Sequence, residues 1–121
     1  MNPQPKKNVV RHLFNAIGHS LNGLKHVWRL QLSFRIEAIL SFFIIPCAIW
    51  LAQSWIEFAL LLGSWLLILI IEVVNSAIEV TIDRISLEHH ELSGRAKDYG
   101  SAAVFLACVN AVIIWGIKLF Y

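Results

Sequence analysis

Three acidic residues lie on one face of a predicted helix, directly after a long apolar run. Glu72, Glu79 and Asp83 share this face with Asn75 and Ser76, at the spacing i, i+3, i+4, i+7 and i+11 that a helix requires. An acid at membrane depth costs about 2.5 to 3.5 kcal/mol, so acids are retained there mainly where they face protein, water or substrate. The row therefore predicts a functional site in which carboxylates accept a proton or hold a cation.

A second polar cluster begins the last apolar segment and includes Lys97, Asp98 and Ser101. A short polar loop separates it from the first cluster, so the two helices are expected to be antiparallel neighbours. Counting equally from the turn places Ser101 near Glu79 and Asp98 near Asp83. The two polar clusters are therefore predicted to converge.

Phosphoryl transfer fits these residue types. The chain has no G-x-x-x-x-G-K-[ST] loop and no Gly-rich kinase loop, so its sequence does not support the usual soluble nucleotide-binding folds. The reaction needs carboxylate-held metal, a cation and a base. Glu72 lies deepest and is the candidate base, and Glu79, about 10 Å nearer the end of the helix, could hold Mg²⁺. Lys97 supplies the cation, Asp98 could hold a second metal or the nucleotide, and Asn75 could orient Glu72.

Both clusters together resemble the signature of the prokaryotic diacylglycerol kinase family. The resemblance extends from about Ala16 to Trp115 and is closer to the Gram-negative branch than to the undecaprenol kinases. The matching stretches are Glu72-x-x-Asn75-Ser76-Ala77-Ile78-Glu79-x-x-x-Asp83-Arg84 and Glu91-Leu92-Ser93-Gly94-Arg95-Ala96-Lys97-Asp98-x-Gly100-Ser101-Ala102-Ala103-Val104.

The resemblance implies a homotrimer that phosphorylates diacylglycerol with ATP and Mg²⁺, with its sites at subunit boundaries. It assigns Glu72 as general base, with Asn75 in support, and Glu79 as metal ligand, with Asp83 near the catalytic cluster. The residues that it places at ATP are His12, His19, Glu79, Glu88, His89, His90, Lys97 and Asp98.

A lipid site on the first two helices is also implied by the resemblance, because many residues there match family positions. The residues assigned to the lipid are Ala16, Gly18, Ser20, Gly23, Lys25, Trp28, Phe34, Arg35, Glu37, Glu72, Ser101 and Trp115.

Three positions depart from the family pattern. Gln31 stands where a second metal-binding glutamate is usual, and an amide oxygen can bind Mg²⁺ but brings no negative charge. His19 occupies an aromatic position near the adenine, and His12 a basic one. These changes favour weaker metal and nucleotide binding.

The elements that position these residues are predicted to be membrane helices. The chain has 121 residues, of which 58% are hydrophobic and 15% charged, too apolar for a soluble domain of this length. We expect one all-α integral membrane domain over residues 1–121, with spans at about 34–52, 57–86 and 95–119. Pro46 should kink or loosen the first span. Ala103, Ala107 and Ala111 recur every fourth residue and permit another helix to approach closely. Cys47 and Cys108 lie in apolar runs and are predicted to be buried hydrophobic residues.

Residues 9–29 predict an amphipathic helix on the membrane surface. Apolar side chains recur on one side, and His12, His19 and His26 lie on the other. A zinc site at these histidines would need a further ligand and is disfavoured.

Charge placement predicts the orientation. Nine of the ten Lys and Arg residues lie before the apolar run that begins at Ala38 or within residues 84–98, so the N-terminus is expected in the cytoplasm of a bacterium, with a multi-pass chain in the inner membrane. No signal peptide is predicted, and a net charge of +2 does not favour nucleic acid. The alternatives are a polyprenol kinase, a proton- or ion-conducting oligomer, and a non-catalytic scaffold.

Overall fold

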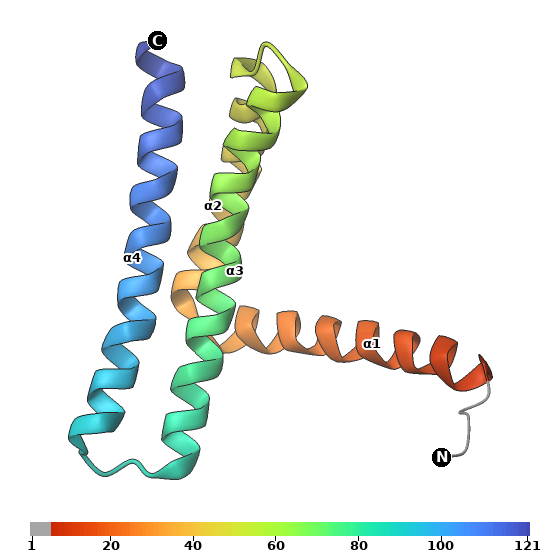
Figure 1. Cartoon of the computed structure of the whole chain (residues 1–121), viewed down its shortest axis with the longest axis vertical. Helices are drawn as coiled ribbons and strands as arrows, with labels where there is room; N and C mark the ends of the chain where they lie inside the picture. Colours follow the sequence, from red (N-terminus) through yellow and green to blue (C-terminus); the bar gives the residue numbers. More distant parts are fainter. Residues whose placement is uncertain (1–5) are drawn as a thin grey trace.

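In a computed structural model that describes residues 6–121, the chain folds into four helices (Figure 1). They are α1 (Lys6–Leu30), α2 (Leu32–Leu51), α3 (Trp55–Ile85) and α4 (Glu91–Phe120). The expected all-α class is confirmed, and α2, α3 and α4 are each long and apolar enough to cross a membrane. Pro46 lies inside α2, which continues past it to Leu51.

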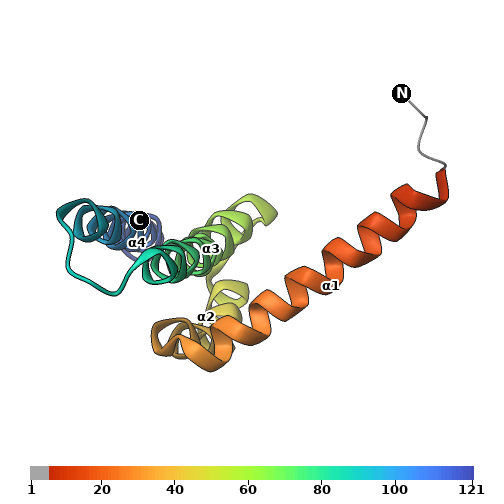
Figure 2. The same ribbon diagram turned by 90° about the horizontal axis from the view of Figure 1, so that it is seen from below.

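Helix α3 is the centre of the arrangement. It packs against α4, which runs antiparallel to it, and against α2 on another side (Figures 1 and 2). The α3–α4 contact includes a small buried cluster of Ile68, Ala107 and Ala111. Ala107 and Ala111, two of the three alanines expected to permit a close approach, lie buried in this cluster. Their small methyl side chains allow the backbones of α3 and α4 to lie near each other.

Two tryptophan side chains join the apolar helices through hydrogen bonds. The indole nitrogen of Trp65 on α3 donates to Ser41 Oγ on α2 over 2.8 Å. That of Trp115 on α4 donates to the Leu61 carbonyl oxygen on α3 over 3.2 Å. Each bond gives a polar group a partner inside an apolar layer, where an unpaired group would be costly.

A corner separates α1 from α2. Gln31 is extended, with φ −114° and ψ 106°, and interrupts the helix. The guanidinium of Arg35 then donates to the carbonyl oxygens of Trp28 (3.0 Å) and Arg29 (2.8 Å), which end α1 without helical partners. It also lies 5.9 Å from the centre of the Trp28 ring. As a result α1 projects sideways from the other three helices (Figures 1 and 2).

At the other end of the membrane-spanning helices, Glu57 links the α2–α3 connection to α4. Ser54 Oγ caps α3 by accepting from the Glu57 amide (3.2 Å), and Glu57 Oε2 accepts from the Gln53 amide (2.8 Å). The same carboxylate pairs with Lys118 of α4 at 2.8 Å. The α2–α3 connection is therefore joined to the C-terminal turn of α4.

The length of α3 determines where its polar residues lie. Thirty-one residues span about 46 Å, whereas the hydrocarbon layer is about 30 Å thick. If Glu57 marks one boundary, the other falls about 20 residues later, between Glu72 and Asp83. Glu72 is then inside the apolar layer near its edge, and Asp83 is outside it.

Replacing Ser41 with Ala should destabilise the contact between α2 and α3. The substitution leaves the Trp65 indole N–H without a partner, and we expect a loss of about 1 kcal/mol in the free energy of unfolding. Unfolding in mixed micelles of increasing SDS content would measure it. Thr81→Ala is the matched control, since Thr81 Oγ1 bonds only to the Ala77 carbonyl of its own helix. An equal loss in both variants would contradict the prediction.

Candidate active site

The polar face of α3 is graded from buried to exposed. Glu72 and Ser76 are each only 8% exposed, Asn75 and Glu79 are half-buried, and Asp83 is exposed. Ser76 donates its hydroxyl to the Glu72 carbonyl oxygen at 2.8 Å, which satisfies it within the helix. The buried acid of this face is therefore Glu72.

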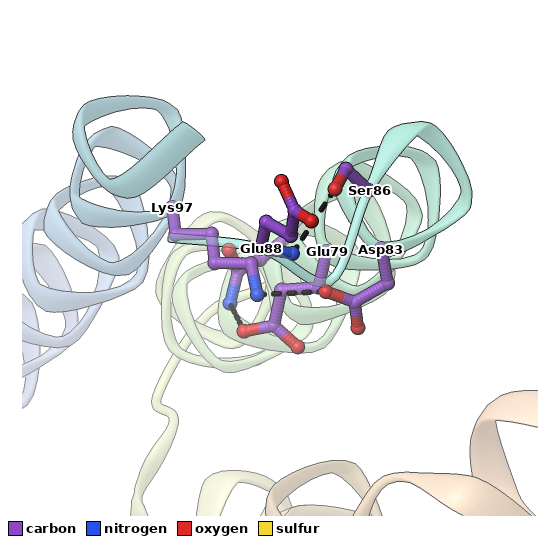
Figure 3. A network of polar contacts seen from close by, with 6 residues as sticks. Glu79, Asp83, Ser86, Glu88 and Lys97 are labelled. Carbon is purple, nitrogen blue, oxygen red and sulfur yellow. Dashed lines mark hydrogen bonds and ion pairs between the residues drawn. The ribbon is translucent and has the colours of Figure 1, made fainter. Parts of the chain in front are cut away.

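Helix α4 meets this face through Lys97 and Gly100. Lys97 Nζ pairs with Asp83 Oδ1 at 2.8 Å (Figure 3). Gly100 packs against Asn75. The sequence had placed Asp98 and Ser101 opposite α3, but both are exposed. Each lies about 100° further around α4 than the residue that makes the contact. The two polar clusters do converge, through different side chains than expected.

Asn75 occupies the space that Gly100 leaves open. Its amide nitrogen donates to Glu79 Oε1 at 3.4 Å, while its Oδ1 is buried and accepts no hydrogen bond from the described residues. A Cβ on Gly100 would overlap that oxygen and lie 3.6 Å from Ile78 Cδ1. Gly100 thus allows α4 to lie close to Asn75, because a Cβ there would force the Asn75 amide to move from its place beside Glu79.

The third helix of the site is α2, which contributes Glu37. The side chains of Glu37 and Glu72 lie within hydrogen-bonding range, and the thiol of Cys108 on α4 interacts electrostatically with both carboxyl groups. The sequence assigned Glu37 to the lipid site and predicted a buried hydrophobic residue at Cys108. No pattern along the chain predicted that they would meet Glu72, because they come from three different helices.

A hollow adjoins Lys97 at the α3–α4 loop. It has a volume of about 200 Å³, and a neighbouring one of about 450 Å³ shares part of its wall. The predicted ATP residues Glu88, His89 and His90 line both. His90 also caps α4, since its Nδ1 accepts from the Leu92 amide at 3.1 Å. The hollow places a cation, Lys97, beside the loop that was expected to bind nucleotide.

The residues predicted on α1 do not reach this region in the single chain. His12, Ala16, Gly18, His19, Ser20 and Lys25 are all exposed along α1, which leads away from α3 (Figure 1). Ser20 bonds only to the Ala16 carbonyl oxygen of its own helix, at 3.0 Å. Arg35 is engaged in the α1–α2 corner. The structure therefore brings together part of the predicted set on α2–α4, leaves the α1 residues apart from it, and places Trp115 elsewhere, against the Leu61 carbonyl.

Glu79 is the residue best placed to hold a divalent cation. Within residues 6–121 no three His, Cys, Asp or Glu side chains are grouped as a complete metal site. Mg²⁺ is commonly held by one or two carboxylates together with substrate phosphates, so a half-buried Glu79 near Lys97 fits this cation. Gln31, the other predicted ligand, lies at the α1–α2 corner.

The chain is similar in sequence to known proteins over most of its length. The sequence profile of the prokaryotic diacylglycerol kinase family matches residues 18–119. A diacylglycerol kinase of Haemophilus influenzae is 44% identical over 116 residues, covering 96% of this chain and 98% of that protein. One from Escherichia coli is 46% identical over 107 residues, 88% of each chain, and one from Pseudomonas aeruginosa 44% over 117 residues, 95% of each.

Replacing Gly100 with Ala should separate α4 from the polar face of α3. The new methyl group overlaps the Asn75 amide oxygen, and overpacking of this kind costs about 1 to 3 kcal/mol of unfolding free energy. Gly116→Ala is the matched control on the same helix, since a Cβ there meets nothing within 4 Å. Adding Asn75→Ala to Gly100→Ala should recover part of the loss. A double variant as unstable as the sum of the two single ones would refute the contact.

Proposed function

Because the chain belongs to the prokaryotic diacylglycerol kinase family, we propose that it transfers the γ-phosphoryl group of ATP to the free hydroxyl of diacylglycerol, with Mg²⁺ as cofactor and phosphatidic acid as product. The observation that carries the proposal is the gradient along α3, with Glu72 at membrane depth and Lys97 meeting Asp83 beyond it. Such a gradient offers one site to a lipid hydroxyl and to a water-soluble phosphate donor.

Glu72 is the proposed base. A carboxylate that is 8% exposed can take the hydroxyl proton of a lipid that lies in the apolar layer beside it. Asn75, fixed by Gly100, holds Glu79 through its amide nitrogen. When bound, Mg²⁺ would supply positive charge to the transferring phosphoryl group, with Glu79 as its principal protein ligand and Gln31 as a second.

Lys97 is the proposed cation for the nucleotide phosphates. Its partner Asp83 is 47% exposed, and ion pairs this exposed contribute little stability. A triphosphate, which carries more negative charge than one carboxylate, can therefore replace Asp83 as the partner of the Lys97 ammonium. The loop residues Glu88, His89 and His90, which line the adjoining hollow, are placed to contact the rest of the nucleotide.

The membrane and neighbouring copies of the chain are proposed to complete the surroundings of the site. The apolar side chains of α1, among them Leu13, Phe14 and Ile17, are exposed in the chain and suit a helix lying on the inner leaflet of the bacterial inner membrane. The N-terminus is then cytoplasmic. A homotrimer would allow α1 of one copy to bring His12 and His19 to the α3–α4 face of another, completing the nucleotide and lipid sites.

An assay of the purified full-length chain tests the proposal. With ATP and Mg²⁺, diacylglycerol should be phosphorylated, whereas undecaprenol should be a poor substrate. Glu72→Gln should lower kcat at least about 100-fold, the usual contribution of a general base, without loss of folded protein. Glu57→Gln, a change at the far end of the same helix, is the control. Proton or ion flux without ATP consumption, or turnover of undecaprenol alone, would refute the assignment.

Gln31 gives a second prediction. The wild-type chain should be active, and Gln31→Glu should lower the Mg²⁺ concentration for half-maximal activity severalfold, since it adds a negative charge to the proposed ligand set. Mg²⁺ titrations of both proteins at saturating ATP would measure this. An inactive wild type with an active Gln31→Glu variant would show that the amide is not tolerated.

A further inference from the structure

Two carboxyl groups meet at the α2–α3 contact. Glu37 and Glu72 lie within hydrogen-bonding range of each other, and both are withdrawn from solvent. Near this contact the two helices are joined by a hydrogen bond, since Trp65 Nε1 donates to Ser41 Oγ at 2.8 Å and Ser41 Oγ in turn donates to the Glu37 carbonyl oxygen at 2.9 Å. The two carboxyl groups are therefore held together by the packing of the helices.

Neither carboxylate has a compensating cation among the residues that the structure describes. The only basic side chain close by in sequence, Arg35, donates to the Trp28 and Arg29 carbonyls at the α1–α2 corner. The other titratable groups facing the pair are Cys108 on α4 and Glu79 on α3, and ionising either adds negative charge.

The contact between the two carboxyl groups lacks a hydrogen-bond donor unless one of them is protonated. Glu37 Oε2 is buried and receives no hydrogen bond from any described residue. Two carboxylates in such contact cannot both ionise without a large repulsion, whereas a single proton between them supplies the missing donor and leaves one negative charge. The geometry is thus satisfied by the singly protonated pair.

We propose that Glu37 and Glu72 share one proton in the resting protein, and that Glu37 is the positioning residue that holds Glu72 ready as the base. Glu37 in its acid form donates to Glu72, which can then remain ionised at membrane depth. This inference rests on the proposed kinase function for its catalytic consequence, whereas the shared proton itself follows from the contact.

In the proposed phosphoryl transfer, the Glu37–Glu72 pair accepts the proton that the lipid hydroxyl loses. The lipid hydroxyl oxygen forms a bond to the γ-phosphorus, and its proton goes to the Glu72 carboxylate. The bond from the γ-phosphorus to the β,γ-bridging oxygen breaks, and ADP leaves with the electron pair. The Glu37–Glu72 pair then holds two protons, and release of one to solvent restores the starting state.

Infrared spectroscopy of the full-length chain in micelles at neutral pH tests the shared proton without requiring turnover. The wild type should show the C=O stretch of one protonated, buried carboxyl group. Glu37→Gln and Glu72→Gln should each abolish that band, because the remaining acid ionises beside an amide donor. Glu57→Gln, which removes a carboxylate paired with Lys118, should leave it in place. Absence of the band in wild type, or its persistence in both single variants, would overturn the proposal.

Kinetics test the positioning role. Glu37→Gln keeps a donor to Glu72 and should retain more of the wild-type kcat than Glu37→Leu, which should lose about tenfold or more, the usual value of a hydrogen bond to a charged group. The KM for ATP should change little in both. The kcat of wild type should fall at alkaline pH as the shared proton is lost, and this fall should be absent in Glu37→Gln, whose amide cannot ionise.

The infrared and kinetic measurements distinguish the kinase assignment from the shared proton and from the positioning role of Glu37. An inactive wild type that shows the infrared pattern would remove the kinase assignment and keep the shared proton. An active wild type whose alkaline fall persists in Glu37→Gln, or a fully active Glu37→Leu variant, would remove the role of Glu37 and keep the kinase. If Glu37→Leu does not fold, the isosteric Gln variant still decides through the infrared band and the pH profile.

Discussion

Burying a carboxylate inside an apolar bundle is the constraint on which the rest of this structure depends. Glu72 is 8% exposed and follows the uncharged apolar part of α3, and an acid in that position is tolerated only where protein shields it from hydrocarbon. Small residues of α4 allow that helix to lie close against α3, and the Trp65–Ser41 bond fixes α2 on another side. The shielding comes from three helices, so no isolated segment could provide it.

The polar face of α3 also explains why α4 has its particular register. Gly100 lies against Asn75, where a Cβ would overlap the amide oxygen, and the long side chain of Lys97 reaches Asp83 nearer the loop end of the two helices. One contact between a glycine and an amide thereby fixes the height of a cation relative to a row of acids. The half-exposed ion pair adds little stability, which suits a lysine that must exchange partners when a nucleotide binds.

The single chain also leaves much apolar surface uncovered. Side chains on α1 such as Leu13 and Phe14 are exposed, and so are Phe42 and Leu106 on the membrane-spanning helices. Lipid covers such surfaces at little cost, and further copies of the chain can cover others. The proposed trimer would place α1 of one copy against the α3–α4 face of another. This is consistent with the distance of the α1 residues from the polar side chains of α2, α3 and α4 in the single chain.

The sequence by itself determined the helices, the three membrane-crossing segments and the face of α3 that bears the acids. These follow from composition and from a period of 3.6 residues, which are local properties of the chain. The register of α4 was predicted only approximately, since Asp98 was expected near Asp83 and Ser101 near Glu79, whereas Lys97 pairs with Asp83 and Gly100 lies against Asn75. The meeting of Glu37 with Glu72, and the engagement of Arg35 at the corner, were decided by tertiary structure alone. The physical reason is that side-chain contacts between helices depend on how each helix is rotated and how deep it sits, and packing sets both.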